Sequence, residues 1–112
     1  MHAMTRSALA AALGLALVTG TASAGDPERG KAKSEPCQAC HGPDGNSPNP
    51  AFPTIAGQYQ SYLRQALADY ASGARKNAIM QGFAAGLSEE DRADLAAYYS
   101  RQKGLRVVET DR

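Results

Sequence analysis

Residues 37–41 read Cys37-Gln38-Ala39-Cys40-His41, and this stretch decides the fold of the chain. Two cysteines with two residues between them, followed directly by a histidine, form the motif of covalent haem attachment. The two thiols can bond to the two vinyl groups of one porphyrin, and the imidazole can bind the iron. The motif therefore predicts one covalently attached haem c, held by Cys37 and Cys40, with His41 as an axial ligand of the iron.

Other chemistries use the same residue types. A structural zinc site needs four Cys or His ligands, and after residue 24 the chain offers only Cys37, Cys40 and His41. A disulfide across two intervening residues closes a very small loop and constrains little of the unfolded chain. A thioredoxin-like redox pair would lie beside a strand-helix-strand pattern, which this sequence lacks. Haem attachment is the favoured interpretation, and the disulfide is its alternative.

The first 24 residues have the pattern of a secretory signal peptide. Arg6 supplies the positive charge, residues 8–18 form an apolar run, and residues 22–24 read Ala-Ser-Ala, a small-residue cleavage site. The run is too short and too rich in alanine for a membrane anchor, which needs about 20 apolar residues. We therefore expect cleavage after residue 24, a periplasmic location and no stable membrane insertion of the mature protein.

Residues 25–104 form the expected domain, and residues 105–112 form a short polar tail. Acidic and basic side chains are equal in number after residue 24, so no basic excess favours binding to nucleic acid. A domain this small buries a modest apolar core and often needs a cofactor, a metal or a disulfide for stability. A haem would supply the missing apolar volume.

Two helices are predicted before residue 73. Asp26 is a good N-cap for a helix from Pro27 to about Ser34, and Pro36 is expected to stop it. Apolar side chains at helical spacing predict a second helix over about residues 58–71, which ends near Gly73.

A third helix is predicted after Ser88, which is its N-cap, with Asp91 as the capping-box partner. Its buried face is expected to carry Leu95, Tyr98 and Tyr99. No segment shows a strand pattern. The expected fold class is all-α, with three main helices plus loops wrapped around one covalently bound haem.

The second axial ligand is sought among the remaining residues. After residue 24, His41 is the single histidine and Met80 the single methionine. Residues 73–86 lack a sustained period and are expected to form an irregular loop that brings Met80 to the opposite face of the haem. A thioether is a soft ligand that suits ferrous iron. The alternatives are core packing by Met80, or ligation by Lys76, Asn77 or water.

Further haem contacts are expected around these ligands. An axial histidine normally donates from its other ring nitrogen to a carbonyl, and the proline-rich loop makes Pro53 the candidate acceptor. Ile55, in the segment that follows, is a further expected contact. Tyr62 and Leu63 lie on the apolar face of the second helix, where core and cofactor contacts coincide.

With these motifs in place, the chain resembles a class I cytochrome c, most closely the small bacterial cytochromes of the c4/c553 group. The resemblance covers essentially all of residues 25–104. It rests on residues 25–31, Cys37–Gly45, Pro53–Gln58, Met80, and Leu87–Asp91 with Asp94–Tyr99.

The resemblance implies thioether bonds at Cys37 and Cys40, with His41 and Met80 as axial ligands. It also implies that the carbonyl of Pro53 accepts from His41. Where the first and last helices cross, it implies that Gly30 packs against Tyr98. Cytochromes c4 have two haem domains in tandem, whereas this chain has one Cys-x-x-Cys-His motif and no internal repeat.

The expected function is that of a periplasmic one-electron carrier and not of an enzyme, because both axial positions would be filled. Its expected partners are redox proteins that donate and accept the electron. One alternative is a haem subunit held tightly by a catalytic partner, such as a flavoprotein or a sulfur-oxidising dehydrogenase. Another is an enzyme or gas sensor in which Met80 does not bind the iron.

Overall fold

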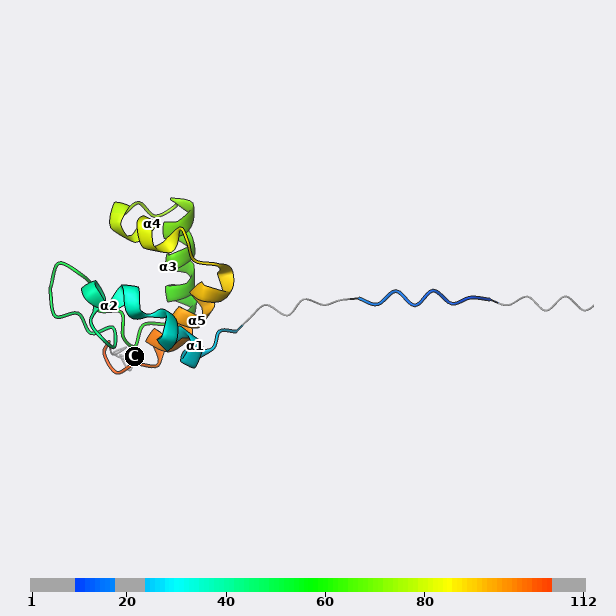
Figure 1. Cartoon of the computed structure of the whole chain (residues 1–112), viewed down its shortest axis with the longest axis horizontal. Coiled ribbons are helices and arrows are strands. Elements are labelled where there is room, and N and C mark those ends of the chain that lie inside the picture. Colours follow the sequence, from blue (N-terminus) through cyan, green and yellow to red (C-terminus); the bar gives the residue numbers. More distant parts are fainter. Residues whose placement is uncertain (1–9, 18–23, 106–112) are drawn as a thin grey trace, which may run out of the picture.

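The structure is a computed structural model that describes residues 10–17 and 24–105. In this part of the chain five helices and no strands are found. The helices are α1 (Pro27–Lys33), α2 (Glu35–His41), α3 (Gln60–Ser72), α4 (Ala78–Ala84) and α5 (Glu89–Ser100). The all-α fold class is confirmed, and the three main helices correspond to α1, α3 and α5 (Figure 1). No helix in the described ranges is long and apolar enough to cross a membrane.

Both ends of the chain are described only in part. Much of the expected signal peptide lies outside the described residues, and residues 10–17 are exposed without regular secondary structure. At the other end, residues 106–112 of the expected tail also lie outside the described residues. Leu105 donates its backbone N–H to the carbonyl of Ala56 at 2.8 Å. Within the described residues, a backbone hydrogen bond of the domain therefore reaches one residue past the predicted boundary at residue 104.

Helices α1 and α2 follow one another with only Ser34 between them. The predicted N-cap of α1 is confirmed, since Asp26 Oδ1 accepts from the N–H groups of Glu28 at 2.8 Å and Arg29 at 3.0 Å. The first helix ends at Lys33, close to its predicted end at Ser34, but a second helix that was not predicted begins at Glu35, and Pro36 lies in its first turn. A proline is tolerated there, since an N–H in the first turn has no partner within the helix.

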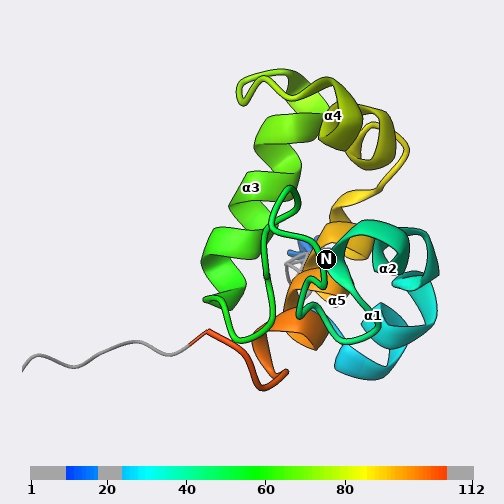
Figure 2. The same cartoon turned by 90° about the vertical axis from the view of Figure 1, so that its left-hand side faces the viewer.

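Helix α4 packs against one end of α3 (Figure 2). Helix α3 ends at Ser72 with Gly73 as its C-cap, near the predicted end, whereas the expectation of an irregular segment over residues 73–86 is wrong for α4. Asn77 caps α4, and its Oδ1 accepts from the N–H groups of Ile79 at 3.1 Å and Met80 at 3.0 Å. A helix of seven residues is not stable alone. It depends on that cap and on its packing against α3, which periodicity does not reveal.

Helix α5 forms the centre of the domain and contacts both α1 and α3 (Figure 2). The predicted capping box is confirmed, because Ser88 Oγ accepts from the Asp91 N–H and Asp91 Oδ2 accepts from the Ser88 N–H, each at 3.0 Å. The predicted buried face is also confirmed, since Leu95, Tyr98 and Tyr99 are all buried. Burial in fact extends to every residue from 93 to 99, so α5 is enclosed on most of its circumference.

The crossing of α1 and α5 requires a glycine at position 30. A Cβ atom on Gly30 would collide with the carbonyl oxygen of Asp94 and would lie 2.8 Å from Tyr98 Cβ. The backbones of the two helices therefore approach more closely than any side chain allows. The expected packing of Gly30 against Tyr98 is confirmed by this geometry.

A buried carboxylate also joins α1 to α5. The side chain of Asp94 is fully buried, and its Oδ2 lies 2.7 Å from Lys33 Nζ and 3.4 Å from Arg29 Nε. Its Oδ1 accepts from the backbone N–H of Asp26 at 2.8 Å. Lys33 Nζ also lies 2.8 Å from Asp91 Oδ1, so one ammonium group pairs with two carboxylates of α5. The sequence reasoning missed this network, because its members are about 60 residues apart.

Replacing Asp94 with Asn is expected to lower the free energy of unfolding by about 2 kcal/mol at neutral pH. Burial alone raises the pKa of Asp94, but Lys33 and the Asp26 N–H outweigh burial and hold that pKa below its usual value of 3.8. Lys33 and the Ser88 N–H likewise lower the pKa of Asp91 to about 2. The two carboxylates therefore stabilise the fold fully at pH values above their pKa in the unfolded chain. This stabilisation is lost as the pH falls through their lower pKa in the folded protein. Denaturant unfolding of the holoprotein between about pH 7 and pH 2 measures it.

The matched control is Glu90→Gln on the same helix. Glu90 lies 3.7 Å from Arg29, but both side chains are more than half exposed, so the loss should be under about 1 kcal/mol. The Asp94→Asn variant should also lose less stability than the wild type as the pH falls below about 4. Equal acid dependence in the two proteins would show that Asp94 does not contribute through its charge.

Candidate haem site

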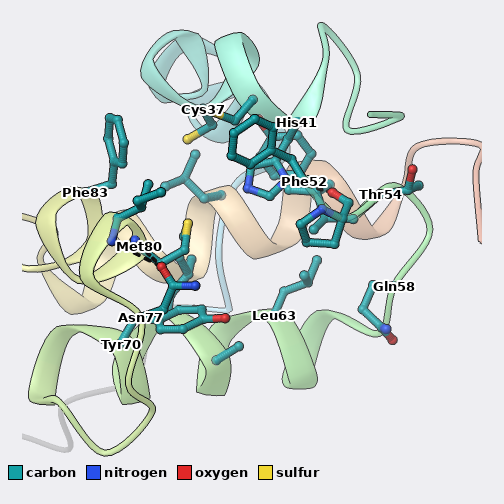
Figure 3. Close-up of a pocket in the computed structure, with 18 of the residues that line it drawn as sticks. Cys37, His41, Phe52, Thr54, Gln58, Leu63, Tyr70, Asn77, Met80 and Phe83 are labelled. Carbon is teal, nitrogen blue, oxygen red and sulfur yellow. Dashed lines mark hydrogen bonds between the residues drawn. The ribbon is translucent and has the colours of Figure 1, made fainter. Parts of the chain in front are cut away.

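A largely apolar cavity of about 450 Å³ lies between α2, α3, α4 and α5 (Figure 3). Every site residue predicted from the sequence lines this cavity. These residues are Cys37, Cys40, His41, Pro53, Ile55, Tyr62, Leu63 and Met80. The fold thus brings together four separate segments of the chain, and the motif residues face Met80 across the same enclosed space.

His41 is the last residue of α2, and its side chain is buried. Its Nδ1 lies 2.7 Å from the carbonyl oxygen of Pro53, so the ring donates to that oxygen when Nδ1 carries the proton. This is the hydrogen bond expected from the sequence. It leaves Nε2 as the ring nitrogen with a free lone pair, which is the form that binds a metal.

The loop after α2 turns back on that helix and holds the Pro53 carbonyl in place. Gly42 adopts φ 82°, and a Cβ there would collide with the carbonyl oxygen of Asn46. Ser47 Oγ donates to the Cys40 carbonyl at 3.2 Å, and the Ser47 N–H donates to Thr54 Oγ1 at 3.1 Å. The loop is therefore ordered by its own hydrogen bonds, and it forms the wall of the cavity beside His41.

Cys37 and Cys40 lie on α2 and line the cavity as free thiols, not as a disulfide. Burial raises the pKa of the Cys37 thiol, although an interaction with Tyr99 partly opposes this. Cys37 therefore stays protonated at neutral pH. Both thiols thus lie in the wall of the cavity, beside the space that a porphyrin would fill.

Met80 enters the cavity from α4, the helix capped by Asn77 (Figure 3). The cap fixes the first turn of α4 through the N–H groups of Ile79 and Met80 themselves. Asn77 also lines the cavity, but its Oδ1 is engaged in these two hydrogen bonds. Met80 is therefore held at the cavity by the residue that the sequence reasoning weighed as a competing ligand.

An arginine not singled out by the sequence reasoning lies at the rim of the cavity. Arg75 Nη1 donates to the Tyr62 hydroxyl at 3.2 Å, and its guanidinium carbon lies 4.8 Å from the centre of the Tyr70 ring. All three residues line the cavity. A cation held between two tyrosines closes part of the rim, and the sequence offers no signal for it because Arg75 follows the end of α3.

The residues of the cavity fit a covalently bound haem. The donor set combines an oriented imidazole from His41 with a thioether from Met80, which suits haem iron. Three large side chains that line the cavity are about half exposed to solvent, namely those of Tyr62, Ile79 and Phe83. A flat apolar group in the cavity would cover this exposed surface. The hydroxyl of Tyr99, on the α5 wall, is buried without a hydrogen-bond partner in the described part of the chain.

The α5 wall was only half foreseen. Leu95 and Tyr99 were predicted as buried by their spacing, but not as residues that line the site. Ala96 of α5 also lines the cavity, and so do Ile79 and Phe83 of α4, which the sequence did not single out either. Helical spacing could have marked the α5 residues as candidates, because one buried face can serve both the core and the cofactor.

Comparison with known proteins supports the same assignment. The family model described as cytochrome c matches residues 27–101. The chain is 48% identical to cytochrome c4 of Pseudomonas aeruginosa over 87 residues, which are 77% of this chain and 43% of that protein. It is 46% identical to cytochrome c-554(548) of Halomonas halodenitrificans, covering 71% of this chain and all of that protein.

The crystal structure of reduced cytochrome c4 from Pseudomonas stutzeri superposes with a TM-score of 0.70 at 46% identity. That match covers 73% of this chain and 48% of the c4 chain, so the protein spans about half the length of its c4 relatives. The chain is also 44% identical to a thiosulfate dehydrogenase electron acceptor of Thiomonas intermedia, over 60% of this chain and 31% of that protein. The resemblance to class I cytochromes of the c4 group is confirmed by these matches.

Proposed function

Because this chain belongs to the cytochrome c family, we propose that it carries single electrons between partner proteins through one haem with His41 and Met80 as axial ligands. The prediction of a covalently attached haem c is confirmed by the family model and the c4 relatives, and Cys37 and Cys40 fit its attachment motif. When bound, the haem iron supplies a one-electron couple between the ferric and ferrous states.

The single observation that carries the proposal is the convergence of the motif and Met80 on one cavity. His41 is oriented by Pro53, Met80 is placed by the cap of α4, and both thiols lie on the same helix as the imidazole. Ile55, Tyr62 and Leu63 provide the apolar lining that excludes water from the iron. With both axial positions filled by the chain itself, no position on the iron stays open for a substrate, which favours a carrier over an enzyme.

We place this function in the periplasm, with residues 1–24 as the exported chain's signal peptide. The alanine-rich run, the single arginine before it and the Ala-Ser-Ala site support that placement. Its partners are then redox proteins of the same compartment.

The second candidate is a haem subunit bound tightly to a catalytic partner. The 44% sequence identity with part of a thiosulfate dehydrogenase electron acceptor is compatible with this version. The balanced charge of the domain gives no strong field that would steer a transient encounter.

Gel filtration of the native protein from a periplasmic extract separates the two candidates. A free carrier should elute at the mass of one folded domain and take up one electron per haem in a reductive titration. Elution with a larger protein, in a fixed ratio and at physiological salt, would reject the free carrier and support the subunit. Absence from the periplasmic fraction would reject the proposed compartment.

A further inference from the structure

Among the described residues, the hydroxyl of Tyr99 is the one buried side-chain polar atom that has no hydrogen-bond partner. The residue is 3% exposed, lies on α5 and lines the haem cavity. Burying a hydroxyl without a partner is unfavourable, and native proteins rarely leave one unpaired. The hydroxyl therefore indicates a hydrogen-bond acceptor that is completed when the cavity holds its cofactor.

Burial raises the pKa of the Tyr99 hydroxyl, and among its polar neighbours the side chain of Cys37 raises this pKa further whereas that of Ser34 opposes the rise. Ser34 Oγ donates to the Lys31 carbonyl at 2.7 Å and accepts from Gln38 Nε2 at 3.2 Å, and Ser34 does not line the haem cavity. Cys37 packs against the apolar cluster that contains Tyr99. Of the two groups, only the Cys37 sulfur lines the haem cavity, so it is the acceptor that attachment of the haem would alter.

Haem attachment changes what the Cys37 sulfur can do. In the addition of the thiol to a vinyl group, the S–H bond breaks and a sulfur-carbon bond forms. The proton and the electron pair of the double bond complete a new C–H bond on the other vinyl carbon. No electrons are gained or lost overall. A thiol can both donate and accept, whereas the resulting thioether can only accept, which complements a phenolic donor.

We propose that the hydroxyl of Tyr99 donates a hydrogen bond to the Cys37 sulfur once this sulfur is bonded to the haem, and that this bond raises the reduction potential. The inference rests on haem attachment through Cys37. A hydrogen bond to the sulfur withdraws electron density from the attached porphyrin, which favours the ferrous state over the ferric state. Tyr99 is thus a positioning residue that acts on the iron through the thioether.

Tyr98 supplies a matched control on the same helix. Its ring centre lies 5.0 Å from that of Tyr99, and it is also buried. Its hydroxyl points to the Pro43 carbonyl at 3.5 Å, and it does not line the haem cavity. Removing this hydroxyl perturbs the same part of the core without touching the proposed bond.

The test compares the wild-type holoprotein with Tyr99→Phe and Tyr98→Phe by potentiometry, and by resonance Raman spectra of the carbon-sulfur stretch in H2O and D2O. We expect a lower reduction potential in Tyr99→Phe and a wild-type potential in Tyr98→Phe. The carbon-sulfur band should shift in D2O in the wild type and in Tyr98→Phe, but not in Tyr99→Phe. A wild-type potential in Tyr99→Phe would overturn the proposal even if that variant unfolds more easily, since a purely structural role affects stability alone.

The deuterium measurement on the wild type also decides the matter if Tyr99→Phe does not mature. A carbon-sulfur band that is identical in H2O and D2O overturns the proposed bond. Failure of the attachment itself would look different. Haem extracted from the wild-type protein by acidified acetone would refute the thioether bonds and leave no band to measure.

Discussion

Replacing both Cys37 and Cys40 with Ala is expected to give a chain that retains no haem and is largely unfolded. The buried core of the described residues is small, because most of its members are alanines and only Leu63, Leu95 and the paired tyrosines of α5 are large. Without haem, the cavity of about 450 Å³ at the centre of the domain would contain water or collapse. A core of this size does not offset the conformational entropy lost on folding.

Far-ultraviolet circular dichroism of the purified variant measures this effect, and we expect most of the helical signal to be lost at 25 °C. The control is Ala39→Ser, which changes an exposed residue between the two cysteines and leaves the motif intact. That variant should attach haem and keep the wild-type spectrum. Native-like helicity in the double alanine variant, with no haem bound, would contradict the view that the cofactor completes the core.

Replacing Met80 with Ala is expected to abolish the charge-transfer band between sulfur and ferric iron and to lower the reduction potential. A thioether stabilises ferrous iron, so its removal favours the ferric state. The vacated position should also admit an external ligand. Carbon monoxide should therefore bind to the ferrous variant and not to the ferrous wild type, as absorption spectra would show.

The matched control for this experiment is Ile79→Ala. Ile79 precedes Met80 on α4, lines the same cavity and is 56% exposed, but offers no ligand atom. The Ile79→Ala variant should retain the charge-transfer band, and its ferrous form should not bind carbon monoxide. An unchanged band in Met80→Ala, or carbon monoxide binding to the wild type, would refute Met80 as the axial ligand and favour the gas-sensor interpretation.

Local sequence signals were sufficient for much of this protein. The caps at Asp26 and Ser88 and the end of α3 at Gly73 depend on residues within one turn, and the structure has them where they were predicted. The haem motif is equally local, since five consecutive residues carry the attachment chemistry. Counting residue types then left a single histidine and a single methionine after residue 24, which made His41 and Met80 the candidates for the axial ligands.

The helical state of α2 and α4 was decided by tertiary structure. Each has seven residues, too few for a helix to be stable on intrinsic propensity, and each contains a residue that usually disfavours helices, Pro36 or Gly82. Pro36 is tolerated because it lies in the first turn. In α4 the cap at Asn77 and packing on α3 compensate for the glycine.

The sequence by itself determined the cofactor and its candidate ligands, because the covalent attachment and the ligand types are properties of individual residues and their spacing. Only the tertiary structure decided what surrounds them. The Asp94 network joins α1 to α5 across 61 residues of chain, Arg75 folds back onto α3, and the α5 residue Tyr99 packs beside Cys37 of α2. Such contacts depend on the three-dimensional path of the backbone, which no local pattern of residues specifies.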